Sequence, residues 1–368
     1  MLNIFDVLLS LAISFTISFL AIPVIITVAE RKKLFDIPDE RKIHINPIPS
    51  LGGLGIFAGF SIAALLSIQF QAASEFQYFL AAALVIFFLG LKDDILVISP
   101  IKKFIGQVLA TFLIIYKGHI QIRSMHGFLG IYELPEMFSL LLTYFTVIVI
   151  VNSFNLIDGI DGLAGSLGLL ASVIFGAYFM QVGMVAYAVL AFSLAGSLVA
   201  FLIFNFQPAK IFMGDTGSML IGLVNAILVV KFINAADVSS ASFPLQASPA
   251  IGFAILVIPL LDTLRVFGIR IFHRRSPFSP DRNHIHHLLL DKGLTHRTIT
   301  MLLGGVNALL VALCYWGQSL GCTFLILSLV ALFFGGIGIL YFTRPRPRLF
   351  VARSVKGEPA EVGNSRIV

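Results

Sequence analysis

The sequence predicts an all-α polytopic membrane protein of about eleven transmembrane helices, with its N-terminus outside and its C-terminus in the cytosol. Of the 368 residues, 58% are hydrophobic and 12% are charged, and the mean hydropathy is +0.97. Soluble domains are about half apolar and about a quarter charged. Apolar runs recur from end to end without a long polar block, which excludes a soluble globular protein and favours one membrane-embedded domain over residues 1–343.

Each candidate span is an apolar segment close to the length that crosses a bilayer. A hydrocarbon core of about 30 Å requires roughly 20 apolar residues of helix, and about 17 to 25 are tolerated. The candidate spans in chain order are 4–28, 52–70, 77–91, 104–117, 137–152, 163–181, 184–204, 217–234, 249–270, 299–316 and 321–342. Several are short, so we expect their ends to shift by a few residues.

The distribution of basic residues supports this count and gives the direction. The first apolar segment has no lysine or arginine before it and a basic cluster at 31–33 after it, whereas a cleaved signal peptide has the opposite polarity. We therefore expect a retained first span with its N-terminus outside. The loops predicted to be cytosolic are then 29–51, 92–103, 153–162, 205–216 and 265–298, together with the C-terminal tail. They hold all but Lys117, Arg123 and Lys231 of the 25 lysines and arginines, as the positive-inside rule requires.

The C-terminal tail, one external loop and two cysteines each carry a further prediction. Residues 344–368 are basic and interrupted by proline, and we expect a disordered cytosolic tail beside anionic headgroups. The external loop 118–136 has a period-two pattern that predicts a small hairpin. Cys314 and Cys322 lie near one end of adjacent spans, and we interpret them as lipid-facing or packing residues, with a disulfide as the alternative.

Five aspartates are predicted at the cytosolic ends of spans: Asp93, Asp94, Asp158, Asp161 and Asp215. An isolated carboxylate beside apolar membrane sequence is costly, and such residues usually have a function. For Asp93 and Asp94 the alternative is a short solvated loop. Adjacent carboxylates facing a common site would instead bind a divalent metal or act as a base.

Polar side chains also recur at helical spacing near these aspartates. Asn152, Asn155 and Asp158 would align on one side of a continued helix, where three oxygens suit a hard cation; the alternative is capping with turns. Asp215 would cap the span at 217–234, whose N–H groups and positive dipole end would also face a bound anion. Mg²⁺ held by one or two carboxylates and by substrate phosphates is the expected arrangement for phosphoryl chemistry.

The remaining cytosolic loops supply cations and imidazoles. His284, His286 and His287 fall within four positions beside Arg282. This cluster would bind a nucleotide diphosphate, and a zinc site is the alternative, without cysteines nearby. Lys103 would attract a lipid phosphate at the membrane surface, or it is an ordinary positive flank of its span.

Taken together, the loop motifs resemble the polyprenyl-phosphate N-acetylhexosamine-1-phosphate transferase superfamily. The matching motifs occur in order: Asp39-Glu-Arg41-Lys42-Ile-His44 with 47–53, Lys92-Asp93-Asp94, Lys103 four before Gln107, Asn155 to Ala164, Asn205 to Ser218, and Pro280 to His287. The resemblance implies transfer of a sugar-1-phosphate from a UDP-N-acetylhexosamine to undecaprenyl phosphate with release of UMP. It also implies Mg²⁺ as cofactor, with Mn²⁺ as a substitute. Relatives with a phospho-muramoyl-pentapeptide donor carry three consecutive histidines, so His284-Ile-His286-His287 favours the branch that uses UDP-N-acetylglucosamine. The same branch includes enzymes for other UDP-N-acetylhexosamines, so another such donor is the alternative.

The resemblance also implies roles for individual residues. Metal ligands are expected at Asp215 and Asn155, catalytic roles at Asp93, Asp94, Asp158, Asp161 and His284, and substrate contacts from Lys103, Asn205, Arg282, His286 and His287. In this scheme Lys103 holds the lipid phosphate and Asp93 positions or deprotonates it, which demands little basicity because a phosphate monoester has its second pKa near about 6. Direct in-line attack and a covalent aspartyl intermediate both fit these residue types.

The implied setting is the bacterial inner membrane, with the active site on the cytosolic face, no nucleic-acid partner, and a homodimer left open. A polytopic transporter is the alternative from another class. A transport pathway should place ionisable groups near mid-span, whereas these groups gather at the cytosolic ends, so the enzyme is favoured.

Overall fold

The computed structural model describes residues 4–34, 48–69, 73–236, 243, 245–276 and 283–343. Its helices in chain order are α1 (Ile4–Lys32), α2 (Gly52–Ser67), α3 (Glu75–Ile95), α4 (Pro100–Phe112), α5 (Glu136–Ile157), α6 (Leu163–Gln181), α7 (Val185–Asn205), α8 (Gly214–Ala235), α9 (Ser248–Ile255), α10 (Val257–Phe272), α11 (Ile285–Leu290), α12 (His296–Trp316) and α13 (Cys322–Phe342). A π-helical turn, η1 (Leu113–Lys117), extends α4, and a short 3₁₀ turn, η2 (Gln318–Leu320), precedes α13. The predicted tail 344–368, the motif at 39–44 and Arg282 lie outside the described residues.

Every segment predicted as a span is helical, and the protein is an all-α polytopic membrane protein. Seven helices are long and apolar enough to cross a bilayer, namely α1, α5, α6, α7, α8, α12 and α13. The count rises to eight if α9 and α10 form one broken span, while α2 is apolar but has only 16 residues. Eleven full spans and the orientation of the termini therefore stay predictions.

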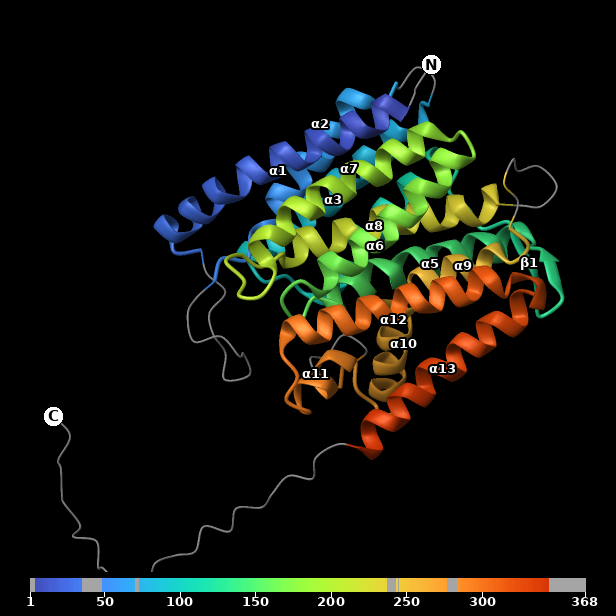
Figure 1. Ribbon diagram of the computed structural model, residues 1–368. Helices are drawn as coiled ribbons and strands as arrows, with labels where there is room; N and C mark the ends of the chain where they lie inside the picture. Colours follow the sequence, from blue (N-terminus) through green and yellow to red (C-terminus); the bar gives the residue numbers. More distant parts are fainter. Residues whose placement is uncertain are drawn as a thin grey trace, which may run out of the picture.

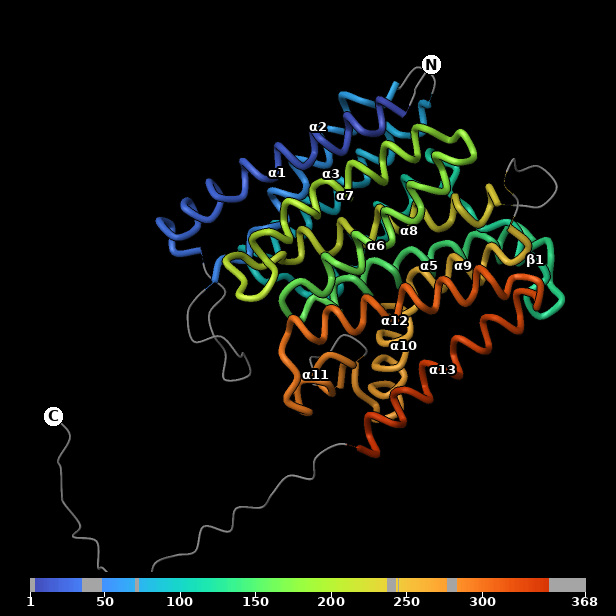
Figure 2. Tube along the Cα trace, viewed as in Figure 1, coloured from blue at the N-terminus to red at the C-terminus, as the bar shows by residue number. Residues whose placement is uncertain are grey.

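The helices form a bundle around α8. Figure 1 shows α1, coloured blue, and α13, coloured red, on opposite sides, with α8 and α5 between them, and Figure 2 shows the same path as a tube. In α8, 89% of the apolar window is buried, against 17% in α1 and 22% in α13. A helix that is apolar on all sides belongs in the interior, whereas outer helices present apolar side chains to lipid.

Small residues let α1 approach its neighbours closely. Ser10, Ser14 and Ser18 repeat every four residues and are fully buried on one face of α1. A Cβ built on Gly59 would lie 2.1 Å from Ser18 Oγ, and one built on Gly196 would lie 2.1 Å from Ser14 Oγ. Close backbone packing over small residues is a common way for membrane helices to associate.

The hairpin predicted at 118–136 is confirmed and is tied to the C-terminal helices. Strands β1 (Ser124–Phe128) and β2 (Ile131–Glu133) pair antiparallel. The hairpin contacts α13, where Leu129 N donates to Thr323 Oγ1 at 2.8 Å. Cys314 and Cys322 are both buried and free, as expected of packing residues.

The predicted span 249–270 is broken, which the sequence analysis does not anticipate. The chain bends by 78° between α9 and α10, and Figure 1 shows α10 running across the neighbouring helices. A break leaves backbone groups without helical partners, and hydrocarbon cannot hydrate them. Asn307 of α12 supplies partners: its Nδ2 donates to Ile255 O at 3.0 Å, and its Oδ1 accepts from Ile258 N at 3.4 Å.

Candidate active site

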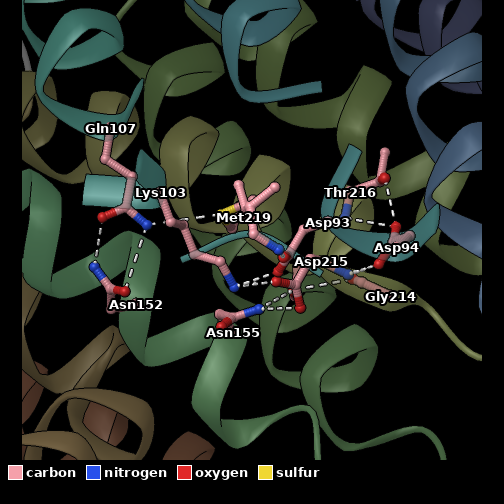
Figure 3. A network of polar contacts seen from close by, with 12 residues as sticks. Asp93, Asp94, Lys103, Gln107, Asn152, Asn155, Gly214, Asp215, Thr216 and Met219 are labelled. Carbon is pink, nitrogen blue, oxygen red and sulfur yellow. Dashed lines mark hydrogen bonds and ion pairs between the residues drawn. The ribbon is translucent and has the colours of Figure 1, made fainter. Parts of the chain in front are cut away.

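Four helix ends meet at one end of the bundle and bring distant polar side chains together. Asp93 and Asp94 lie in the last turn of α3, Lys103 in the first turns of α4, Asn155 near the end of α5, and Asp215 at the start of α8. Figure 3 shows these side chains pointing toward one another. The sequence motifs that contain them therefore converge in space.

Lys103 is the centre of this cluster. Its Nζ lies 2.6 Å from Asp93 Oδ2, and it also forms an ion pair with the carboxylate of Asp215. Asn155 Nδ2 donates to Asp215 Oδ1 at 2.8 Å and to Ser218 Oγ at 3.0 Å. One ammonium between two carboxylates leaves an excess of negative charge. The cluster is partly shielded from solvent, since the side chains of Lys103 and Asp93 are 20% and 12% exposed.

Asp93 is also anchored to the backbone. Ile98 N donates to Asp93 Oδ1 at 2.7 Å, across the turn that joins α3 to α4. One carboxylate oxygen thus holds the turn while the other faces Lys103. This anchoring fixes Asp93 relative to the lysine on the next helix, as a functional pair requires.

Asp94, predicted as catalytic, contacts the start of α8. Its carboxylate accepts from Asp215 N at 2.7 Å, from Thr216 N at 3.1 Å and from Thr216 Oγ1 at 2.6 Å. An acidic side chain at a helix N-terminus satisfies free N–H groups and the positive dipole end. The N–H groups predicted to face a bound anion are thus occupied by Asp94, which caps α8 and positions Asp215 rather than sharing its cation.

Glycines allow the backbone to close around this cap. Gly214 has φ +71°, and a Cβ there would lie 2.7 Å from the Asp94 carboxylate. A Cβ on Gly53 would lie 2.3 Å from Gly217 N, and one on Gly90 would lie 2.5 Å from Thr216 Cα. The glycines of α2 and α3 therefore let both helices contact the start of α8 directly.

The three residues spaced every three positions do not form one cation site. Asn152 lies one turn deeper than Asn155 and forms a buried pair with Gln107, to which its Nδ2 donates at 2.8 Å (Figure 3). Asp158 lies beyond the last residue of α5, so the helix does not carry it onto the same side. Of the three, Asn155 alone contacts Asp215.

Asp158 nevertheless lies in a strongly acidic environment. The surrounding protein excludes water from it, and the like charges of Asp215, Asp94 and Asp161 add to this effect. Together they raise the pKa of the Asp158 carboxyl from 3.8 to about 8. An aspartate with so perturbed a pKa beside charged partners is a candidate functional residue.

Asp161 and Asn205, predicted as catalytic and substrate-binding, hold the protein backbone instead. Asp161 is buried, with Oδ1 at 3.3 Å from His296 Nδ1 and Oδ2 accepting from Ala209 N at 3.3 Å. Asn205 is buried too, accepting from Gly162 N and donating to Ile211 O, both at 2.8 Å. Since these atoms serve neighbouring loops, the structure gives both residues a positioning role.

The three histidines lie side by side next to the loop that carries Asp158. The rings of His284 and His286 are parallel with centroids 5.6 Å apart, and His287 lies 4.4 Å from His286. A Cβ on Gly159 would lie 2.3 Å from His286 Nε2, so the histidines pack directly on that loop. Burial and the neighbouring imidazoles lower the pKa of His286 to about 3, which keeps this ring neutral.

Two features bear on what the sequence analysis proposed for this cluster. In the part of the chain that is described, no group of three or more His, Cys, Asp or Glu side chains is arranged to hold a metal ion. Asp262 and Arg265 of α10 pair with each other and contact the histidine segment, and neither is among the residues predicted for the site. Two charged residues three apart within a predicted span were the available signal.

Similarity to known proteins agrees with this arrangement. Residues 76–233 match the model of glycosyl transferase family 4. The chain is 35% identical over 314 residues to the decaprenyl-phosphate N-acetylglucosaminephosphotransferase of Mycobacterium leprae, covering 78% of this chain and 77% of that protein. It is 31% identical over 299 residues to the undecaprenyl-phosphate alpha-N-acetylglucosaminyl 1-phosphate transferase of Yersinia pestis, covering 80% and 79%. A probable undecaprenyl-phosphate N-acetylglucosaminyl 1-phosphate transferase of Bacillus subtilis is 30% identical over 300 residues, covering 79% and 80%. With such identity over most of both chains, the protein belongs to glycosyl transferase family 4, the polyprenyl-phosphate N-acetylhexosamine-1-phosphate transferases that its motifs resemble.

Proposed function

We propose that this protein transfers N-acetylglucosamine-1-phosphate from UDP-N-acetylglucosamine to undecaprenyl phosphate and releases UMP. The names of its relatives specify a polyprenyl phosphate and N-acetylglucosamine phosphate as the reacting partners. The observation that carries the proposal is the cluster of Lys103 with Asp93, Asp215 and Asn155 at the converging helix ends. Such a cluster suits phosphoryl transfer, in which positioning and charge neutralisation supply most of the catalysis.

In this proposal Lys103 binds the phosphate of the lipid acceptor. An ammonium at a membrane surface attracts an anionic headgroup, and this one is already positioned by two carboxylates. Asp93 then lies beside the acceptor phosphate, where it orients the attacking oxygen or accepts its remaining proton. Ile98 N, which donates to Asp93 Oδ1, holds the carboxylate in place for this step.

The residues around Asp215 fit a magnesium ion. Two carboxylates share one ammonium, so they already favour positive charge between them, and Asn155 adds an amide next to Asp215. Mg²⁺ prefers oxygen ligands and is usually held by one or two carboxylates plus substrate phosphates. Asp215 and Asn155 would hold it, and once bound it would neutralise charge on the donor diphosphate. Asp94 keeps Asp215 in position through the α8 cap.

The donor would lie toward the histidine segment. His284, His286 and His287 pack on the loop that carries Asp158, whose carboxyl lies near Asp215. Arg282, which precedes them in sequence, would pair with a diphosphate. His286, being buried and neutral, would contact the sugar or base through a neutral hydrogen bond rather than by charge.

The proposal puts the active site on the cytosolic face of the bacterial inner membrane. Support comes from the basic residues, since all but Lys117, Arg123 and Lys231 lie in segments predicted at the same side as the cluster. A UDP-linked donor made in the cytosol would then meet the lipid phosphate at the inner leaflet.

The decisive experiment incubates the purified protein with undecaprenyl phosphate, Mg²⁺ and a panel of UDP-sugars, and measures UMP release. We expect release with UDP-N-acetylglucosamine, dependence on the lipid phosphate, loss with EDTA and recovery with Mg²⁺ or Mn²⁺. Release with another UDP-N-acetylhexosamine alone would move the protein to that donor. No release with any donor, from protein that is folded and extracted intact, would overturn the proposal.

A further inference from the structure

Asp262 is a fully buried carboxylate on α10 whose two oxygens both hold the histidine segment. Its Oδ2 lies 2.8 Å from His284 Nδ1. Its Oδ1 accepts from Arg265 Nη2 at 2.7 Å and from Ile285 N at 2.9 Å. Arg265 also donates to Asn283 O, so this pair organises three consecutive residues at 283–285. A buried ion pair in which both carboxylate oxygens are hydrogen-bonded is a strong positioning element.

This arrangement determines which nitrogen of His284 carries a proton. An ionised aspartate only accepts hydrogen bonds, and the ion pair with Arg265 requires the ionised form. The nitrogen facing Oδ2 must therefore be the donor, so Nδ1 is protonated in both the neutral and the charged imidazole. Nε2 is then the atom left to exchange a hydrogen bond with another group.

We propose that Asp262 is a positioning residue for sugar-phosphate transfer, which fixes the orientation and tautomer of His284 so that Nε2 serves the UDP-sugar donor. The proposal rests on the proposed function for its substrate. It agrees with the place of His284 beside His286, which packs on Gly159 next to Asp158. Arg265 acts through Asp262, and it also donates to Tyr341 Oη on α13 at 3.4 Å.

The change Asp262→Asn should reverse the tautomer without moving the segment. Two donors, Arg265 Nη2 and Ile285 N, face the Oδ1 position, so the amide oxygen of asparagine will occupy that position. Its NH₂ group must then face His284 and donate to Nδ1. The ring proton would move to Nε2, the atom that the proposal assigns to the donor.

A spectroscopic measurement tests the tautomer independently of activity. In protein labelled with ¹⁵N-histidine, the His284 signals are assigned by their loss in His284→Gln. We expect a protonated Nδ1 in the unchanged protein and transfer of the proton to Nε2 in Asp262→Asn. A neutral ring protonated on Nε2 in the unchanged protein would overturn the proposal, even if Asp262→Asn did not fold.

Kinetics test whether Asp262 acts through His284. We expect Asp262→Asn to lower kcat for UMP release by about 10–100-fold, the usual cost of removing the group that orients a functional histidine. The double variant Asp262→Asn/His284→Gln should have the same kcat as His284→Gln alone. If Asp262 acts only through His284, its replacement has no further effect once His284 is gone. Asp291→Asn, the same change at the exposed end of α11, should stay within about twofold of the unchanged protein.

Multiplied effects in the double variant, or an Asp262→Asn enzyme of unchanged rate, would overturn the positioning role. Failure of the proposed function is separable from both outcomes. It would appear as absent UMP release from the unchanged protein with every UDP-sugar, whereas the ¹⁵N tautomer would still report on Asp262.

Discussion

At the scale of single residues, the site depends on a lysine shared by two carboxylates. Lys103 neutralises one of the two charges of Asp93 and Asp215, and the remaining charge favours a further cation. Removing either carboxylate therefore changes both the local charge and the position of the ammonium. Such coupled groups lose activity together and their effects do not add.

The change Asp215→Asn should abolish the Mg²⁺-dependent reaction while the protein still inserts and extracts normally. The amide keeps the shape of the side chain but removes the charge that pairs with Lys103 and would hold the metal. We expect UMP release to fall by at least about 10²-fold, as when a charge-stabilising group is removed from an active site. Full activity in this variant would exclude Asp215 from the site, and Asp6→Asn, at the other end of the bundle, serves as the matched control.

The raised pKa of Asp158 predicts that the stability of the folded protein falls as the pH rises. Its pKa is raised to about 8 in the folded protein, so between pH about 4 and 8 the folded state keeps a proton that the unfolded chain releases. The folded state then binds more protons, and stability falls as the pH rises through this range. In metal-free protein, Asp158→Asn should raise the Tm by about 2–8 °C at pH 8 and much less at pH 5. Thermal unfolding in EDTA measures this, and equal shifts at both pH values would contradict it.

At the scale of elements, the start of α8 is where α2 and α3 approach most closely. Gly53 N donates to Met213 O at 2.8 Å, and Gly52 N donates to Phe212 O at 2.9 Å, so the segment before α8 pairs with the start of α2. Asp94 then caps the helix from α3. The position of Asp215 thus depends on two other helices, α2 through its backbone and α3 through the side chain of Asp94.

The change Gly53→Ala should therefore destabilise the protein and lower its activity. A Cβ at this position would lie 2.3 Å from Gly217 N, on backbone that cannot move aside without shifting α8. We expect a fall in Tm of several degrees, together with a slower reaction. Gly335→Ala in α13, where nothing lies within 4 Å of the added carbon, is the control and should be neutral or slightly stabilising. Equal Tm values for the two variants would show that the close contact at Gly53 does not contribute to stability.

At the scale of the whole molecule, local sequence patterns predict the helices and the gathering of polar groups at their ends. Apolar length and charge place each helical segment, and the period-two pattern at 118–136 predicts the hairpin. The bend between α9 and α10 escapes such reasoning because hydropathy does not register Pro259, whose missing N–H favours a break at this point. The partner that makes the bend tolerable, Asn307, lies about fifty residues away in α12.

For the polar residues, too, local sequence predicts some features, and tertiary contacts decide the others. Lys103, Asp93 and Asp215 lie at the ends of helices, so their convergence follows from topology alone. Whether an aspartate or asparagine faces a site or holds a loop depends on tertiary contacts. Sequence therefore predicts Asp161 and Asn205 as functional, although their side chains are turned to neighbouring backbone.

Orientation in the membrane gives a prediction for the whole chain. Val97 is 96% exposed in the turn next to the cluster, and Leu129 is 63% exposed in the hairpin at the other end. In intact cells, a membrane-impermeant thiol reagent should label Leu129→Cys and leave Val97→Cys unlabelled until the membrane is opened. Cys314 and Cys322 are buried, so they should contribute little background. The reverse labelling pattern would show the opposite orientation in the membrane and contradict a cytosolic active site.

The bend between α9 and α10 sets the direction of α10. The side-chain amide of Asn307 holds the backbone on both sides of this bend. Pro259 has no N–H, so Ile255 O would lack a helical partner even in a straight helix, and Asn307 donates to it instead. The direction of α10, and with it the position of Asp262 and of the histidine segment that Asp262 holds, is therefore set by contacts outside the Lys103 cluster. We therefore expect a change at Asn307 to alter the direction of α10 while leaving the residues around Lys103 in place.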